Sequence, residues 1–136
     1  MKIAIYLNTL ILGLITPSVS AITLHCPPQI KTNQSLDIKV KDWNAFVDDW
    51  SNVNNATKVT FYAGHPKAQA SLAPDNENYK AAKLNWTFNG NDIWLACGYS
   101  YTAVQLIQKL PNQIKTCSVI YDLKSLSPTV LEIKCS

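Results

Sequence analysis

The sequence contains no arginine, although it has 12 lysines and nine acidic residues. Proteins that read nucleic acids depend heavily on arginine and on clustered basic side chains, whereas the lysines of this chain are scattered singly. Arginine is also the side chain best suited to bind a carboxylate or a phosphate through two parallel hydrogen bonds. We therefore expect no nucleic-acid partner.

Residues that carry chemistry are also scarce. The chain has two histidines, His25 and His65, and lacks both the C-x-x-C pairs of zinc sites and the G-x-S-x-G elbow of many hydrolases. The acidic stretch 75–78 lacks the register and the glycine of an EF-hand loop. We expect no metal, no cofactor and no enzymatic activity. An enzyme with an unrecognised site would need His25 or His65 beside a carboxylate in a concave pocket.

The longest apolar run lies at the N-terminus. Lys2 precedes an apolar stretch at residues 3–15, and small residues follow at 19–21. This pattern is typical of a cleavable secretory signal peptide, and the run is shorter than the ~20 residues of a membrane span. We predict a signal peptide over residues 1–21 and a periplasmic protein without a membrane anchor.

All four cysteines lie in the remaining residues 22–136, which are enough for one domain. They are Cys26, Cys97, Cys117 and Cys135. An even number of cysteines behind a signal peptide indicates two disulfides, with three possible pairings. We favour Cys26–Cys135, which would tie the ends of the domain together, and Cys97–Cys117, which would link two late strands.

Alternating apolar and polar residues, separated by turn residues, predict short strands. These fall at 22–26, 36–40, 58–63, 84–88, 93–99, 104–110, 115–122 and 130–135. Asn89 and Gly90 form the strongest short hairpin signal, between the fourth and fifth of these strands. The pattern predicts a mainly β fold, a small antiparallel sandwich or barrel of seven or eight strands.

One segment shows helical spacing instead. Trp43, Phe46, Val47 and Trp50 recur at i, i+3, i+4 and i+7, and Asp42 could cap a helix that starts there. A helix of one or two turns and an aromatic-rich loop both fit this pattern. In either case we expect these aromatic side chains to pack in the core.

Tyrosines near turns are the candidates for binding a partner. Tyr62 and His65 flank one turn, Tyr99 and Tyr101 lie at a hairpin, and a long polar stretch follows at 67–80. Tyrosine on a loop offers a large contact area at a low entropic cost. We predict Tyr62, His65, Tyr99 and Tyr101 as partner-binding residues; alternatively, they only cover the ends of the sheets.

Several segments together carry a family resemblance. They are 22–27, 59–66, 72–74, 86–88, 94–99, and 110–111 followed by Cys117. In them the chain resembles small bacterial signal-peptide proteins encoded near type VI secretion genes. Some of these are periplasmic immunity proteins that neutralise cell-wall-targeting effectors, here of the l,d-transpeptidase type. The resemblance implies that the domain caps the catalytic cleft of a secreted effector, with the loop after Tyr62 and the 99–102 hairpin as contacts.

Another class of function remains open beside this one and the unrecognised enzyme. Small periplasmic β domains also inhibit host wall hydrolases of the lysozyme type. A strongly basic target would favour an acidic inhibitor. Without Lys2 this chain still has eleven lysines against nine acidic residues, so its mildly basic character places lysozyme inhibition second.

Overall fold

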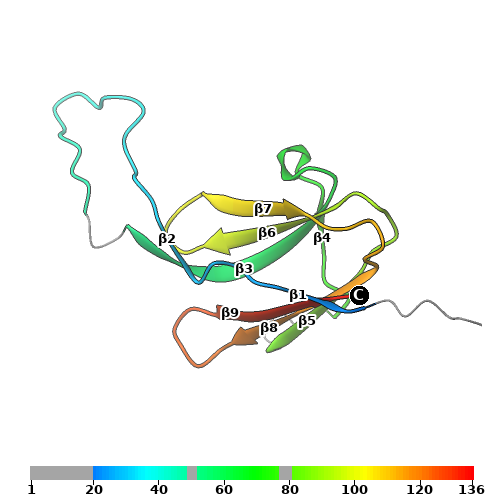
Figure 1. The fold of residues 1–136 in the computed structure, drawn as a ribbon. Helices are drawn as coiled ribbons and strands as arrows, with labels where there is room; N and C mark the ends of the chain where they lie inside the picture. Colours follow the sequence, from blue (N-terminus) through cyan, green and yellow to red (C-terminus); the bar gives the residue numbers. More distant parts are fainter. Residues whose placement is uncertain (1–19, 49–51, 77–80) are drawn as a thin grey trace, which may run out of the picture.

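The computed structural model describes residues 20–48, 52–76 and 81–136. The predicted signal peptide therefore lies outside the described residues except for its last two positions. Within the described part, nine strands form two antiparallel sheets, stacked as a sandwich (Figure 1). The predicted mainly β fold is confirmed. No helix of the described part is long and apolar enough to cross a membrane.

The first sheet has four strands in the spatial order β1-β9-β8-β5. Their bounds are Ile22–Leu24 for β1, Thr129–Cys135 for β9, Thr116–Asp122 for β8 and Lys83–Thr87 for β5. Ile22 pairs with Cys135, so the start and the end of the described chain lie side by side in this sheet.

The second sheet has five strands, with β2-β3-β6-β7 in order and β4 added beside β3. Their bounds are Gln29–Lys31 for β2, Val53–Ala63 for β3, Ile93–Tyr99 for β6, Gln105–Lys109 for β7 and Ser71–Leu72 for β4. A short 3-10 helix, η2 (Pro66–Ala68), lies in the β3–β4 connection. The sequence pattern did not predict β2 or β4, which have only three and two residues.

The core lies between the sheets, because alternate residues of the long strands point inward. Phe61 of β3, Val119 of β8 and Ile133 of β9 are fully buried. The Phe61 ring packs with its centroid 5.0 Å from that of Trp86 and 5.2 Å from that of Phe88. Aromatic pairs at such distances and tilts add to the stability gained from burial.

The predicted disulfide pairing is wrong: the bonds are Cys26–Cys97 and Cys117–Cys135. Cys117 and Cys135 are register partners on β8 and β9, both facing the core, so they are already adjacent. Cys26 follows β1, where the chain leaves the first sheet to enter the second as β2, and there it meets β6. The two ends of the domain are instead joined by the pairing of β1 with β9.

The predicted hairpin at Asn89 and Gly90 is also wrong. The strands on either side, β5 and β6, belong to different sheets, so this connection crosses from one layer to the other. A two-residue type I′ hairpin needs positive φ at both central residues, and neither of these two has it. The β6–β7 connection, by contrast, joins neighbouring strands as expected.

The predictions for residues 36–50 fail in a more informative way. In the described part of this segment, residues 36–48, there is neither a strand at 36–40 nor a helix from 43 onward. Trp50 lies outside the described residues. The apolar side chains here, which we expected in the core, are exposed. The segment extends away from both sheets between β2 and β3 (Figure 1).

Candidate functional site

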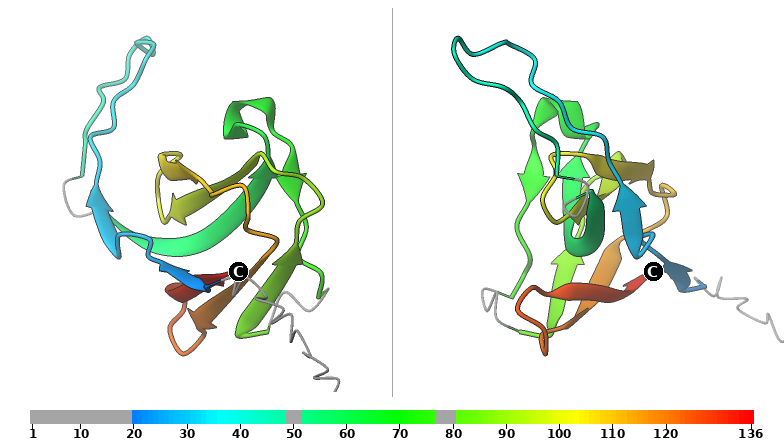
Figure 2. Two further views of the ribbon diagram at one scale, coloured as in Figure 1. Left: turned by 45° about the vertical axis from the view of Figure 1, so that its right-hand side comes forward. Right: turned by 90° about the vertical axis from the view of Figure 1, so that its left-hand side faces the viewer.

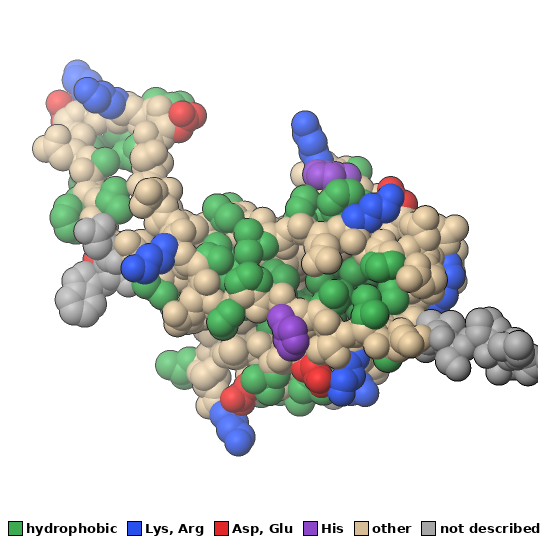
Figure 3. Space-filling model, viewed as in Figure 1, with side chains coloured by type: hydrophobic (Ala, Val, Ile, Leu, Met, Phe, Trp, Pro, Cys, Tyr) green, Lys and Arg blue, Asp and Glu red, His purple; other side chains and the backbone are tan. Residues whose placement is uncertain are grey.

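The segment between β2 and β3 holds six of the exposed large apolar side chains of the described residues, and we call its described residues 33–48 the arm. It projects beyond the end of the five-stranded sheet, on the side away from the four-stranded sheet (Figure 2). Its exposed apolar side chains are those of Leu36, Ile38, Val40, Trp43, Phe46 and Val47. Figure 3 shows hydrophobic, acidic and lysine side chains mixed on it.

The arm has two legs that meet at a turn. The Trp43 N–H donates to the carbonyl oxygen of Val40 at 3.2 Å, and Asp42 between them has a positive φ of 65°. A positive φ at the third residue of a turn is a type II feature, which asparagine and aspartate tolerate better than most side chains. Leu36 on one leg and Phe46 and Val47 on the other help to line a hollow of about 310 Å³ between the legs.

A hydrogen-bond network fixes the base of the arm. The Thr32 N–H donates to the Asn52 carbonyl at 3.0 Å, and the Thr32 hydroxyl donates to Asn54 Oδ1 at 2.8 Å. Asn54 is fully buried, and its Nδ2 donates to the Ser100 carbonyl at 2.6 Å. Both side-chain functions of this buried amide are thus satisfied, and they connect the ends of β2 and β3 to the β6–β7 turn.

Tyr101 belongs to this end of the molecule. Its carbonyl accepts a hydrogen bond from Gln34 Nε2 at 2.8 Å, which ties the β6–β7 turn to the first leg of the arm. The side chain is 78% exposed and the residue has a positive φ of 58°. A tyrosine in this conformation costs free energy, so the turn is held in place by its surroundings.

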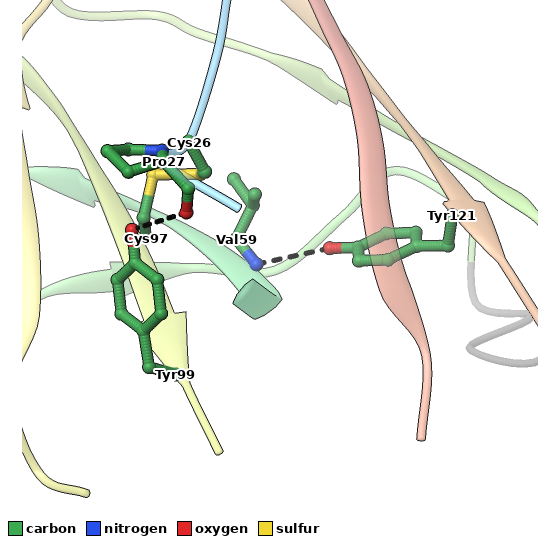
Figure 4. The surroundings of a disulfide bond; sticks show 6 residues. All are labelled: Cys26, Pro27, Val59, Cys97, Tyr99 and Tyr121. Atoms are coloured by element: carbon green, nitrogen blue, oxygen red, sulfur yellow. Dashed lines mark hydrogen bonds between the residues drawn. A yellow bond between two sulfur atoms is a disulfide. The ribbon is translucent and has the colours of Figure 1, made fainter. Parts of the chain in front are cut away.

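Tyr99 lies two residues earlier but points into the molecule. It is only 6% exposed, and its hydroxyl donates to the Pro27 carbonyl at 2.9 Å (Figure 4). Burial raises the pKa of this phenol. Tyr99 therefore fastens the chain just after Cys26, where the disulfide to Cys97 also holds it. Its role in the structure is to support the β6–β7 end from within.

Tyr121 makes a second contact of this kind, from the opposite sheet. Its hydroxyl accepts a hydrogen bond from the Val59 N–H of β3 at 3.2 Å (Figure 4). Burial raises the pKa of Tyr121 as well, while this backbone hydrogen bond acts in the opposite direction. The two sheets are therefore joined by a polar contact in addition to their apolar side chains.

Tyr62 and His65 lie at the other end of the β3–β6 pair. Tyr62 is the register partner of Trp94 on β6. The exposed His65 ring packs edge-on against the Trp94 ring, with 4.7 Å between the two ring centroids. His65 Nδ1 accepts the Lys67 N–H at 3.1 Å and so caps the short η2 helix. The structure brings these two predicted residues together, but it separates them from Tyr101 and the arm.

An ionic contact adjoins this corner. Asp92 Oδ1 lies 3.0 Å from Lys109 Nζ and accepts a hydrogen bond from Trp94 Nε1 at 3.1 Å. The hydrogen bond from Lys109, followed by that from Trp94, holds the pKa of Asp92 below its ordinary value. Among the residues that the structure describes, no group of three or more His, Cys, Asp or Glu could hold a metal ion.

The edge strand β7 adds a further exposed surface. All five of its residues are exposed, including Leu106 and Ile107, and Val104 precedes them. In Figure 3 hydrophobic side chains gather over the middle of the visible face, between the arm and the β3–β4 connection. The sequence pattern predicted this strand but gave no sign that both of its faces would be open to solvent.

A rigid, disulfide-bonded sandwich that exposes apolar side chains on an arm and an edge strand is typical of a small binding domain. The family of type VI secretion system Tli immunity proteins matches residues 51–136, and the chain belongs to this family. An immunity protein of this kind binds a secreted effector. No curated protein and no solved structure matches the chain. The matched residues begin after the arm, so the family match by itself assigns no role to the arm.

Proposed function

We propose that the protein is a periplasmic immunity protein that binds a cell-wall-targeting type VI effector and blocks its activity. Membership of the Tli immunity family carries this proposal, because it identifies the chain as the partner of a secreted effector. The resemblance found in the sequence favours an effector of the l,d-transpeptidase type.

The cysteines and the N-terminus support a periplasmic location. Disulfides persist in oxidising compartments such as the bacterial periplasm, and all four cysteines are paired. Residues 1–21 have the pattern of a signal peptide. An effector that attacks the cell wall works in that same compartment, so its immunity protein must be present there to protect the cell.

Blockade by a rigid domain fits the way this chain is built. Binding costs less when the contact loops are already ordered, and here a disulfide, the Asn54 network and the Tyr99 hydrogen bond hold the loop ends. We propose that Tyr101, Tyr62 and His65 contact the effector. Tyr99 acts from inside, by keeping the β6–β7 end in position.

Protection of cells from the effector tests this proposal directly. The effector encoded beside this gene would be sent to the periplasm of a sensitive strain, with the immunity protein made either with or without residues 1–21. We expect growth to be rescued only when residues 1–21 are present, together with a one-to-one complex in calorimetry that stops the effector acting on purified peptidoglycan. Rescue without residues 1–21, or inhibition of lysozyme in place of the effector, would contradict the proposal.

Point variants then test the contact residues. Tyr101→Ala and Tyr62→Ala should each weaken effector binding, since truncating a tyrosine at the centre of an interface commonly costs at least about 1–2 kcal/mol. Leu126→Ala is the matched control, because Leu126 is fully exposed on the β8–β9 connection of the other sheet. Equal affinity for all three variants would remove these two tyrosines from the contact surface.

A further inference from the structure

We infer that the arm binds the effector as an extended strand that places Leu36, Ile38 and Val40 in an apolar groove of that protein. This inference rests on the proposed function, since it names the element by which an effector would be held. It goes beyond the family assignment because the arm lies outside the matched residues.

The exposure of the arm is the first support. Trp43, Phe46 and Ile38 are 79%, 88% and 76% exposed, although burial of each would contribute free energy to folding. Contiguous exposed apolar side chains on a small protein commonly mark an interaction site. Large aromatic side chains such as Trp43 are also the residues that most often act as anchors in interfaces.

The second support is a strand pattern without a partner strand. Leu36, Ile38 and Val40 alternate with charged residues, which is the period of a strand with one apolar face. Yet residues 36–43 show a single backbone–backbone hydrogen bond to any described residue, the one that closes the turn at Trp43. Backbone amides in residues 36–40 are therefore open to pairing with another chain. Extended segments with unpaired backbone amides can bind another protein by adding a strand to the edge of its sheet, with alternate side chains in pockets.

The charges of the arm favour an apolar groove over a charged one. Asp37, Lys39, Lys41 and Asp42 carry two negative and two positive charges, so the first leg and its turn are close to neutral. Complementarity to a strongly charged surface would need one sign to dominate. The apolar face of this leg is therefore the part that can distinguish one groove from another.

The fixed base shows that the arm is displayed outward. Its first leg is tied to the sandwich by the Thr32–Asn54 hydrogen bond and by the Gln34–Tyr101 hydrogen bond. The exposed Tyr101 side chain lies beside this base, so the arm and the β6–β7 turn can contact one partner together. We take the effector as this partner, because an immunity protein of this family is defined by binding one.

Amide exchange and calorimetry test the inference, using the chain with both disulfides formed and the purified effector encoded beside its gene. In the complex, amides of residues 36–40 should become protected in alternation, as in an edge strand paired on one side. Ile38→Asp should weaken the Kd by about 30-fold or more, the loss typical of an interface anchor. The control Leu126→Asp places the same charge on an exposed leucine elsewhere and should change the Kd by less than about threefold. The melting temperature of both variants should equal that of the unaltered chain.

Each other outcome decides against the inference in a recognisable way. If the unaltered chain and Ile38→Asp bind the effector equally, or if residues 36–40 stay unprotected in the complex, the arm is not the docking strand and the proposed function stands. If the free chain is a dimer whose arm amides are already protected, a second copy occupies the arm. If the unaltered chain neither binds nor protects, the proposed function fails as well.

Discussion

The sandwich and the arm are both rich in apolar residues, but only one of them buries its side chains. Phe61 in the sandwich is 0% exposed, whereas Phe46 in the arm is 88% exposed. The difference is the second layer: the strands β3, β8 and β9 each face the other sheet with their buried residues, while the arm extends past the end of both sheets (Figures 1 and 2). Apolar patterning alone thus specifies a surface that needs a partner, and the fold decides whether that partner is internal.

Replacing a phenylalanine by alanine in each region should give the largest difference in the free energy of unfolding. Phe61→Ala removes a ring that packs on Trp86 and Phe88, and it should lower the free energy of unfolding by about 3–5 kcal/mol. Phe46→Ala should change it by less than about 0.5 kcal/mol. Urea unfolding of the two variants measures both values. A loss of more than about 1 kcal/mol for Phe46→Ala would mean that the arm packs on the sandwich in solution.

The Cys26–Cys97 disulfide should rank next among the contributions to stability. It spans 71 residues and includes the arm in its loop, whereas Cys117–Cys135 spans 18. In the chain-entropy account the longer loop gives about 4 kcal/mol and the shorter about 3 kcal/mol. Replacing each pair by alanines should reproduce this order in denaturant unfolding. A larger loss for the shorter loop would show that packing around Cys117 and Cys135 outweighs loop length.

The base of the arm joins the two regions, and Asn54 is its buried link. Asn54→Ala removes the acceptor of the Thr32 hydroxyl and the donor to the Ser100 carbonyl, and should cost about 1–3 kcal/mol. The neighbouring Asn55→Ala is the control, because Asn55 is exposed and its side chain accepts one bond from Gln29. We also expect faster amide exchange around Tyr101 in Asn54→Ala. If both variants lose equal stability, burial of Asn54 is not what fixes the base.

Strand patterns in the sequence predicted most of the sandwich, because alternation reports directly on which face of a strand is buried. Seven of the eight predicted strands overlap observed ones, and β3 and β8 alternate between buried and more exposed residues as expected. In β6, by contrast, the three consecutive residues 95–97 are all buried. Alternation says nothing of strand order, however. The wrong disulfide pairing follows from not knowing that β8 pairs with β9 while β6 lies in the other sheet. The wrong hairpin at Asn89 follows from not knowing that β5 and β6 lie in different sheets.

The candidate site was harder to predict, because exposure depends on the whole fold. Residues 36–40 have the alternation of a strand and 43–50 the spacing of a helix, and both patterns also occur in exposed segments. Tyr99 and Tyr101 lie two residues apart in one hairpin, yet only Tyr101 is exposed. The clue available in the sequence was the position of two incompatible periodicities side by side, without a glycine or proline turn between them.

The corner around Asp92 is intermediate between the two regions, since it is exposed like the arm but held by several contacts. Lys109, followed by Trp94, lowers the pKa of the Asp92 carboxyl in the folded protein. A lowered pKa means that the unfolded chain takes up the proton first as the pH falls. The contribution of this contact is therefore present above the unfolded pKa of about 3.9 and is lost as the pH falls through the lower folded value.

Removing Lys109 should weaken this pH dependence, because the hydrogen bond from Trp94 to Asp92 remains. We expect this to be the smallest of the effects because both side chains of the ion pair are largely exposed. In urea titrations between about pH 6 and pH 2, the unaltered chain should lose more stability than Lys109→Met below about pH 4. Lys124→Met, which removes an exposed lysine on the other sheet, should follow the unaltered chain. Parallel curves for all three proteins would mean that solvent screens the Asp92–Lys109 contact completely.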